Sequence, residues 1–456
     1  MITSNLEKRL KRQIIGKPHR FLAIAPLGFE QTLVQELLNL GLEFADDESK
    51  PHAIGDGKVE FTAKITEAWK AVAYSRIANR ILMHIDDFKA ENFREFEKKS
   101  AEIPWELYLE QPAAIDIHVT CKHSRLYHSD AIAERLHKII EGGSLPLAPV
   151  SPGKANAKVG EPVEPSTTPS PRGSAPNTPH STFHIPHLYV TFLDDRCTIW
   201  LDLAGEELYK RGHERFVNDA PLKETIAAAM LFEAISTSQA SHSALPIALF
   251  DLMAGSGTFS LEAAYMANSL IPGTCRDFAL KHQPAFKEAT WNYIVKQAQT
   301  AKAIKRIVTS DISEHAVKII RHNVECSPLP TSAIEPQLRD FFSYSAQEIV
   351  ENCENAFPVI VLNPPYGKRL DFDAPKLYTR IGRRLAELAR DLAALGQTLT
   401  VAILAPKDDT RAGSNYTCTA NLLRECPGLS PEHNPAAKII ATSHGGFSLN
   451  VFIAKI

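Results

Sequence analysis

The stretch FDLMAGSGTFSLEAA, residues 250–264, decides the fold of the second half of this chain. An apolar run ends at Asp251, and a glycine turn then leads into an apolar helix pattern from about Thr258. The glycines, Gly255 and Gly257, let the backbone approach a ligand closely, and the helix N-terminus offers unpaired amides to a carboxylate or phosphate. Such turns also serve as plain connections between a strand and a helix, so the turn alone is weak support for a cofactor site.

The segments around this stretch predict a Rossmann-like α/β fold. From about residue 220, strands alternate with helices, which is typical of a parallel sheet covered on both faces. The expected strands are residues 247–253, 306–311, 334–340, 358–363, 399–405, 438–442 and 447–454. The last two are joined by only a few residues around Gly445-Gly446, too few for a crossover, so they must pair antiparallel. We therefore expect seven mostly parallel strands with an antiparallel closing hairpin.

Acidic residues follow the next two strands. Asp311 ends the second strand, near the distance at which an α/β nucleotide site places an acidic residue on ribose hydroxyls, and the third strand ends in Asp340-Phe341. These residues and the glycine turn should converge on one crevice. The alternative for either aspartate is a helix N-cap, since Ser313 opens a helix directly after Asp311.

The segment FPVIVLNPPYG, residues 357–367, carries the chemistry. Two prolines stiffen the loop and leave the carbonyls of Asn363 and Pro364 without ladder partners. An exocyclic amine on an aromatic ring is a poor nucleophile because its lone pair is delocalised. Acceptors for its two hydrogens bias the nitrogen toward tetrahedral geometry and aim the lone pair at a methyl donor. Tyr366 then offers a face for the base. The alternative is a rigid turn with a packed tyrosine.

The first half of the chain predicts an accessory α/β region. A strand over residues 21–25 precedes a helix that ends near Gly41, and a strand over 115–119 precedes a helix over 131–140. Two further strands, 188–192 and 197–203, surround a hairpin turn at Asp194-Asp195. The polar face of the helix over 131–140 is expected to carry Lys122, Arg125, Arg135 and Lys138. These residues would form a basic face, which suits phosphate groups, and the alternative is a plain solvated face.

Composition sets wider bounds. At 456 residues, two or three domains are expected, and 50 Lys and Arg against 53 Asp and Glu indicate no particular partner. Seven scattered cysteines suggest neither a disulfide framework nor a zinc site, and no stretch is long and apolar enough for a membrane helix or secretory signal. A cytoplasmic protein without metal is predicted. The Pro- and Ser-rich residues 144–182 are expected to be a disordered insertion.

Further stretches, in a fixed order, add a resemblance to a known family. They are SRIANRILMHIDDFKAENFREFE with IPWELYL, then LDLAGEELYKRG, DAPLKETIAAAML and IPGTCRDFAL. Together with the glycine turn and the Asn-Pro-Pro-Tyr segment, they make the chain resemble the THUMP-domain class I methyltransferases, in particular those that methylate guanine N2 in bacterial 23S ribosomal RNA. The resemblance covers nearly all of the chain apart from the basic N-terminus and the insertion.

The resemblance implies a role for each candidate residue, with S-adenosylmethionine as the cofactor. Asp251, Gly255 and Gly257 would contact its methionine part, Asp311 its ribose and Asp340 its adenine, while Ala254, Thr258, Phe341, Pro221 and Leu222 would complete the pocket. Asn363, Pro364, Pro365 and Tyr366 would hold a flipped guanine. Lys223 and Glu224 would border the pocket, or would simply pair within a helix.

The implied domains are a basic N-terminal tail over residues 1–18, a ferredoxin-like module over 19–65, a THUMP domain over 66–210 and a methyltransferase domain over 211–456. Two departures make the substrate less certain: Met253-Ala254 replaces the usual Pro-Cys, and residues 211–215 read RGHER rather than Arg-Gly-Tyr-Arg. A second, C-terminal methyltransferase, which some relatives carry, is expected to be absent because the chain ends soon after its last strand.

Five functions compete. Methylation of 23S ribosomal RNA leads, and methylation of a transfer RNA is the nearest alternative because the catalytic segment does not distinguish them. A protein glutamine or a DNA base also suits Asn-Pro-Pro-Tyr, but an accessory RNA-binding domain argues against both. A non-catalytic RNA-binding or assembly factor is disfavoured by the intact glycine turn and the intact residues 363–366.

Overall fold

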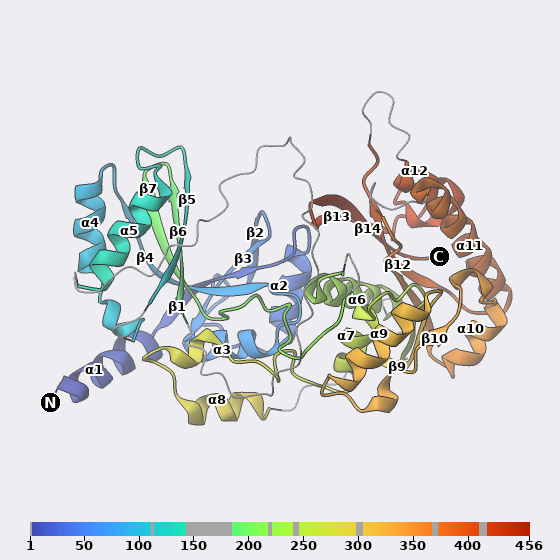
Figure 1. Cartoon of the computed structure of the whole chain (residues 1–456), viewed down its shortest axis with the longest axis horizontal. Coiled ribbons are helices and arrows are strands. Elements are labelled where there is room, and N and C mark those ends of the chain that lie inside the picture. The colour runs from blue at the N-terminus through green and yellow to red at the C-terminus, as the bar shows by residue number, and fades with distance from the viewer. Residues whose placement is uncertain are drawn as a thin grey trace, which may run out of the picture.

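The computed structural model describes residues 2–110, 114–142, 185–217, 221–239, 246–297, 304–366, 373–409 and 417–456. These residues form two seven-stranded sheets, one from each half of the chain, that lie next to each other along the long axis of the molecule (Figure 1). The prediction of a disordered insertion over residues 144–182 lies outside the described residues.

The first sheet has the order β2-β3-β1-β4-β7-β6-β5. Its strands are β1 (Pro18–Ile24), β2 (His52–Gly55), β3 (Lys58–Lys64), β4 (Arg80–Lys89), β5 (Asp116–Lys122), β6 (His187–Leu193) and β7 (Arg196–Asp202). The predicted hairpin turn between β6 and β7 is confirmed. Asp194 and Asp195 both adopt positive φ, 50° and 62°, which is the conformation that a two-residue hairpin turn needs.

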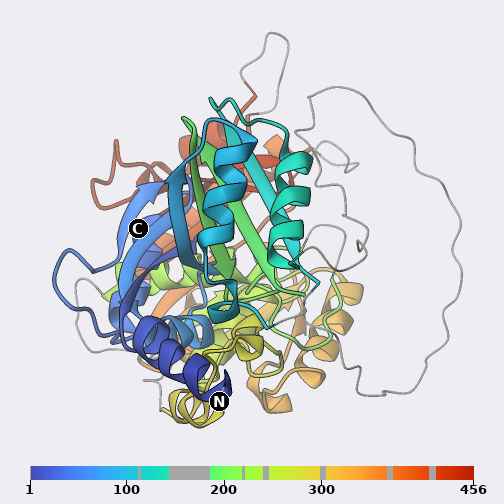
Figure 2. The same ribbon diagram turned by 90° about the vertical axis from the view of Figure 1, so that its left-hand side faces the viewer.

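Four helices cover one face of this sheet. They are α2 (Glu30–Asn39) and α3 (Ile65–Tyr74) over β1 and β3, and α4 (Phe93–Glu102) and α5 (Ser129–Ile140) over β5 to β7. Figure 2 shows α4 and α5 in front of the strands they cover. The elements β1 to β4 with α2 and α3 form one ferredoxin-like unit. The predicted boundary at residue 65 is therefore too early, because α3 and β4 complete that unit.

The N-terminus is not the basic tail that the sequence suggested. The N-terminal residues form helix α1 (Ile2–Leu10), and a π-helical turn over Lys11–Ile15 follows it. Leu10 and Ile14 are buried in the core beside α3, and Arg9 donates a 2.5 Å hydrogen bond to Glu106. The regular spacing of these two apolar residues on one side of the segment explains why it packs instead of fraying.

The second sheet has the order β10-β9-β8-β11-β12-β14-β13. Its strands are β8 (Ile247–Asp251), β9 (Ile304–Asp311), β10 (Gln337–Leu338), β11 (Phe357–Leu362), β12 (Thr400–Pro406), β13 (Lys438–His444) and β14 (Phe447–Lys455). All neighbours are parallel except β14, which is antiparallel to both β12 and β13, so the predicted closing hairpin is confirmed. The predicted strand over 334–340 shrinks to two residues, because Pro336 has no amide for the ladder and Ile334 turns into the core.

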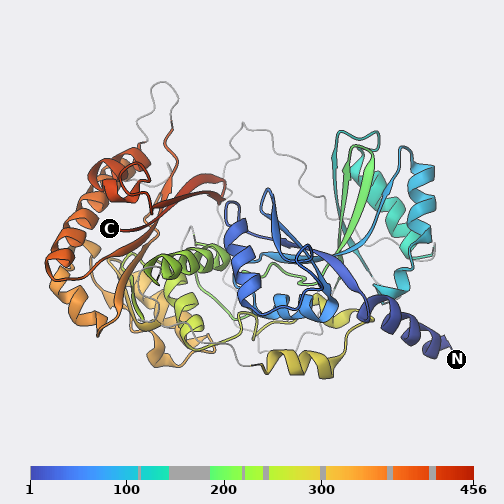
Figure 3. The same cartoon turned by 180° about the vertical axis from the view of Figure 1, so that it is seen from behind.

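Helices cover both faces of this sheet, as Figure 3 shows from behind. The helices are α6 (Glu224–Gln239), α7 (Thr258–Ala267), α9 (Glu314–Glu325), α10 (Ala346–Cys353), α11 (Ala374–Ala394) and α12 (Cys418–Glu425). Helix α8 (Glu288–Val295) instead packs against α3 of the first half, where the Tyr74 hydroxyl donates to the carbonyl of Ile294. Alternate residues of β11 show the two layers: Val359 and Val361 pack toward α6, whereas Ile360 and Leu362 pack toward α10 and α11. Within the described ranges, no helix has the length and apolar character that crossing a membrane requires.

The two sheets are joined by close backbone contacts. Gly28, with φ of 84°, lies against β13 so tightly that a Cβ atom there would come within 2.2 Å of the carbonyl oxygen of Ala441. Arg276 donates to four carbonyl oxygens of the segment that leaves β7, those of Ala204, Glu206, Glu207 and Lys210. One continuous core also runs from α2 and α3 to α6 and β14. The halves of the chain therefore pack as a single body.

Candidate active site

The glycine turn after β8 leaves one backbone position open to a ligand. Both Gly255 and Gly257 have positive φ, 57° and 78°. A Cβ atom on Gly257 would lie 3.1 Å from Ile320 of α9, whereas a Cβ on Gly255 would meet nothing within 4 Å. Gly257 therefore permits close packing of loop against helix, and Gly255 faces open space where a cofactor can approach.

Asp311, at the end of β9, binds the glycine turn directly. One carboxylate oxygen accepts a 2.9 Å hydrogen bond from the amide of Gly255, and the other accepts one of the same length from Ser313. The N-cap of α9 is Ser313, whose hydroxyl accepts from the amide of Ala316. Since a carboxylate offers about four lone-pair sites, Asp311 retains acceptors for hydroxyl groups. Its assignment to a ribose remains a prediction.

Asp251 ends β8, as the sequence predicted, but its side chain is fully buried. Its side chain has no exposed surface, and one carboxylate oxygen accepts from the amide and hydroxyl of Ser260, at 3.2 and 2.7 Å. Burial raises the pKa of Asp251 to about 7. Through Ser260, Asp251 holds the first turn of α7, and its contact with the methionine part of the cofactor stays a prediction. Gly257 and Thr258 are buried as well.

An arginine that the sequence analysis missed crosses the glycine turn. Arg215 donates to the hydroxyls of Ser256, at 3.2 Å, and Thr258, and it forms an ion pair with Glu224. Asn323 of α9 fastens the same segment by accepting from the amide of Phe216 at 2.8 Å. The turn is thus held between the chain before α6 and helix α9. No local pattern in the sequence could predict this contact, because Ser256 and Thr258 lie 41 and 43 residues after Arg215.

The segment at the start of α6 also borders the turn. The carbonyl of Leu222 accepts from Thr258 at 3.5 Å, and the carbonyl of Pro221 accepts from His444 Nε2 at 2.7 Å. Lys223 and Glu224 do not pair with each other: Glu224 binds Arg215, and Lys223 lies 3.6 Å from Glu207. The alternative of a pair within the helix is therefore wrong.

Asp340 and Ile312 follow the two strands that lie beyond β8 in the sheet. Asp340 caps a short 3-10 helix over Phe341–Ser343, because its carboxylate accepts from the amide of Phe342 at 3.0 Å, while Phe341 is buried. The Asp340 side chain is therefore a helix N-cap, which was the alternative interpretation of this residue. Ile312 directly follows Asp311 and is 71% exposed, the largest exposed fraction among the exposed large hydrophobic residues. The sequence does contain a signal for Ile312, because a large apolar residue there directly follows the acidic end of a strand.

The Asn-Pro-Pro-Tyr segment follows β11, which pairs with β8 so that Val361 lies beside Asp251. Asn363 is half-buried, and its Oδ1 atom is buried without a hydrogen-bond partner among the residues that the structure describes. Pro365 is exposed, and Tyr366 lies edge-on to Phe447 with ring centroids 5.8 Å apart. Leaving a buried acceptor unpaired costs about 1–3 kcal/mol. The Asn363 oxygen is therefore available to a hydrogen-bond donor, as is Asp251 Oδ1, which is buried without a partner among the described residues in the same way.

A cavity of about 340 Å³ adjoins this segment through Phe447. It lies between the ferredoxin-like unit and the closing hairpin. Its lining includes Pro26, Leu27 and Asn79 from the first unit, Lys223 from α6, and residues 443–448 of the hairpin. Both units therefore contribute to the surface next to the candidate catalytic residues.

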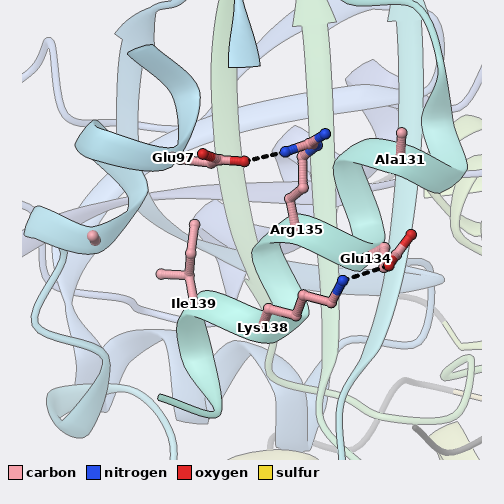
Figure 4. Close-up of a pocket in the computed structure, with 7 residues that line it drawn as sticks. Glu97, Ala131, Glu134, Arg135, Lys138 and Ile139 are labelled. Carbon is pink, nitrogen blue, oxygen red and sulfur yellow. Dashed lines mark hydrogen bonds and ion pairs between the residues drawn. The ribbon is translucent and has the colours of Figure 1, made fainter. Parts of the chain in front are cut away.

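The basic residues expected to contact RNA are less free than predicted. Only Arg135 and Lys138 lie on α5, because that helix begins at Ser129; Lys122 ends β5 and Arg125 follows in a loop. Arg135 pairs with Glu97 of α4, and Lys138 with Glu134, around a pocket of about 430 Å³ (Figure 4). Arg125 pairs with Glu91 and Asp195. Acidic residues thus pair with three of these four cations: Glu134 lies one turn away on α5 itself, whereas the partners of Arg135 and Arg125 come from other elements that spacing along α5 could not show.

Comparison with known proteins identifies the class. Residues 211–406 match the RMKL-like methyltransferase domain, and residues 20–82 match the RlmL ferredoxin-like domain. The second match runs past residue 65 into β4, in agreement with the ferredoxin-like unit described above. The chain therefore joins a class I methyltransferase domain, a class that uses S-adenosylmethionine, to a ferredoxin-like domain. This confirms the predicted fold class and the resemblance to methyltransferases that carry such an N-terminal domain.

Two curated relatives and one solved structure illustrate the likeness. The chain is 28% identical over 385 residues to "Ribosomal RNA large subunit methyltransferase K/L" of Allochromatium vinosum, which covers 81% of this chain and 46% of the relative. It is 27% identical over 358 residues to "Putative RNA methyltransferase YpsC" of Bacillus subtilis, covering 78% of this chain and 80% of the relative. "SMU.472, a putative methyltransferase complexed with SAH" shares the fold with a TM-score of 0.66 at 22% identity, covering 96% of this chain and 98% of that one. The chain spans about half the length of the K/L relatives it matches.

Proposed function

We propose that this protein transfers a methyl group to the exocyclic N2 of a guanine in 23S ribosomal RNA. The proposal rests on the methyltransferase domain, on relatives named for large-subunit ribosomal RNA, and on the composition of the crevice. The buried Oδ1 atom of Asn363 is the observation that favours an amine as the group that receives the methyl. A buried amide oxygen without a partner suits a group that donates hydrogens, which an exocyclic amine does and a carbon or hydroxyl oxygen acceptor does less well.

The residues present fit the cofactor. The open backbone at Gly255 can receive a charged amino-acid group, and Asp311 beside it retains acceptors for hydroxyl groups. Ile312 and the turn at Asp340 and Phe341 would border the adenine. S-adenosylmethionine, when bound, supplies an electrophilic methyl group on a sulfonium.

The chain then has three tasks in the reaction. Asn363 Oδ1 and the carbonyl of Pro364 accept the two hydrogens of the amine, which localises its lone pair for attack on the methyl carbon. Tyr366 offers an aromatic ring for the flipped base, and its edge contact with Phe447 orients that ring. The glycine turn, fixed by Asp311 and Arg215, keeps the donor in place. After transfer the amine nitrogen carries a positive charge and readily loses its proton to water, so a strong base is unnecessary.

The rate of methyl transfer tests this proposal. Purified full-length protein is incubated with labelled S-adenosylmethionine and unmodified 23S ribosomal RNA, and the product nucleoside is identified by mass spectrometry. We expect N2-methylguanosine from the parent protein. Asn363→Ala should retain cofactor affinity and lower the rate by about 100-fold or more, as for other groups used chiefly in the transition state. Asn352→Ala is the matched control because the Asn352 side chain, on α10, donates a hydrogen bond to the carbonyl of Glu348 in the same helix.

Equal rates for Asn363→Ala and the parent would contradict the assigned role. Transfer RNA in place of ribosomal RNA tests the nearest alternative, and methylation of transfer RNA alone would replace the proposed substrate. A protein that binds RNA but shows no calorimetric binding of S-adenosylmethionine would instead be the non-catalytic factor.

A further inference from the structure

Three side chains of the types that bind metal ions meet on the first sheet, outside the methyltransferase domain. They are Asp116 and His118 of β5 and His187 of β6. Ile117 and Val119, which alternate with the first two, pack against the core under α4 and α5. Because side chains alternate across a strand, Asp116 and His118 point to the opposite face of the sheet.

The pairing of the two strands fixes this arrangement. β5 and β6 are parallel, with Asp116 beside His187 and His118 beside Tyr189. The His118 ring lies over the Tyr189 ring with a centroid distance of 4.8 Å and an angle of 23° between the ring planes. The side chains are 35%, 41% and 28% exposed for Asp116, His118 and His187, respectively, so an ion can reach all three from solvent.

The three ligand atoms form a nearly equilateral triangle. Asp116 Oδ2 lies 3.4 Å from His118 Nε2 and 3.3 Å from His187 Nδ1, and the two ring nitrogens are 3.3 Å apart. These distances are long for hydrogen bonds to a carboxylate, which cluster at about 2.7–2.9 Å. A tetrahedral metal with bonds of about 2.0–2.1 Å to nitrogen and oxygen places its ligand atoms about 3.3–3.4 Å apart. The triangle thus has the edge length of a tetrahedral site.

We propose that Asp116, His118 and His187 bind a divalent transition-metal ion of the zinc class, with a fourth position left for water or another oxygen ligand. Two imidazoles and one carboxylate are a ligand set that such ions favour, and Ca²⁺ and Mg²⁺ prefer oxygen ligands alone. The bound ion would fasten β5, the last strand of the sheet, to β6. This proposal is independent of the methyl-transfer reaction.

A second cluster in the described part of the chain serves as an internal comparison. Glu214, His322 and Cys326 also come close together, with Cys326 Sγ 3.3 Å from His322 Nε2. Here the two nearest ligands are one turn apart on a single helix, and the Phe216 ring stacks on His322 with centroids 4.2 Å apart. A thiolate ligand makes this cluster chemically distinguishable from the one on the first sheet.

Metal binding by the full chain tests the proposal. Tag-free protein, stripped with a chelator, is titrated with Zn²⁺ in a calorimeter and with Co²⁺ in an absorption spectrometer. We expect one site in the parent, at least about 10-fold weaker affinity in His187→Ala and in Asp116→Asn, and unchanged affinity in Cys326→Ser. The Co²⁺ spectrum should contain no sulfur-to-cobalt charge-transfer band.

Zn²⁺ should also raise the thermal midpoint of the parent but not of His187→Ala, because an ion that binds only the folded state stabilises it. Far-UV circular dichroism shows whether each variant is folded, and Asp116→Asn provides a second variant if His187→Ala is not. The proposal is overturned if the parent binds no more tightly than the folded His187→Ala variant. It is equally overturned if Cys326→Ser, rather than the first-sheet variants, abolishes binding.

Discussion

Replacing Arg211 by methionine should destabilise the whole protein, because this side chain lies at the centre of a buried network between the two halves. Its guanidinium donates to both carboxylate oxygens of Glu262 on α7, at 2.9 and 3.1 Å. It also donates to the carbonyls of Leu208 and Arg76, each at 2.9 Å. The Arg211 and Glu262 side chains are 2% and 1% exposed.

The expected loss follows from what remains after the substitution. Methionine fills much of the volume but donates no hydrogen bonds. Among the described residues, the buried Glu262 carboxylate then keeps Arg76 as its cationic partner, with the Arg76 Nη1 atom 3.9 Å away. Removing one partner of a buried ion pair costs about 3–5 kcal/mol, and the nearby Arg76 should hold the loss near about 3 kcal/mol. That loss lowers the folding equilibrium constant by a factor on the order of 100.

Urea unfolding, followed by tryptophan fluorescence and circular dichroism, measures this loss if the slope of the transition is unchanged. Arg383→Met is the matched control: its pair with Glu425 at 3.3 Å involves a side chain that is 62% exposed, so the cost should stay below about 1 kcal/mol. Adding Glu262→Leu to Arg211→Met should recover part of the stability, because no charge is then left buried at that position. A loss for Arg211→Met no larger than that of the control would refute the assigned energetic role.

Three further predictions concern the crevice. Burial raises the Asp251 pKa to about 7, above that of the unfolded chain. The unfolding free energy should therefore fall as pH rises from about 4 to 7. Urea titrations at a series of pH values should show a flatter fall for Asp251→Asn. Gly257→Ala should destabilise the protein by about 1–3 kcal/mol, more than Gly255→Ala in thermal melts, since only its Cβ would crowd Ile320. Ile312→Ser should weaken S-adenosylmethionine binding in calorimetry by several-fold while leaving the melting temperature unchanged, because Ile312 is exposed.

The sequence predicted those parts of the fold that local physics determines. The link at Gly445-Gly446 is too short for anything but an antiparallel hairpin, and β13 and β14 pair in that way. The Asp194-Asp195 turn likewise follows from two residue types that tolerate positive φ. Asn363 directly follows β11, which ends one residue earlier than predicted, and the unpaired oxygen there suits the proposed role.

Other features depend on contacts between distant residues, and spacing along the chain could not reveal them. The sequence places Asp251 at a strand end, but only the packing of α7 and β9 around it shows that the carboxylate is buried. Charges on α5 looked like a basic face until Glu97 of α4 was found beside Arg135. His187 is separated from His118 by 69 residues, so no motif could have joined them.

The rigid join between the halves has a consequence for how the proposed enzyme would select its guanine. Gly28 presses on the backbone of β13, whose hairpin partner β14 begins at Phe447 beside Tyr366. RNA that contacted the first sheet would therefore lie at a fixed distance from Asn363, so the position of a guanine relative to that contact would help to select it. Enlarging residue 28 would force Ala441 to shift, because backbone atoms have no alternative rotamer. A change at this glycine should then alter where the methyl group is placed even if cofactor binding is intact.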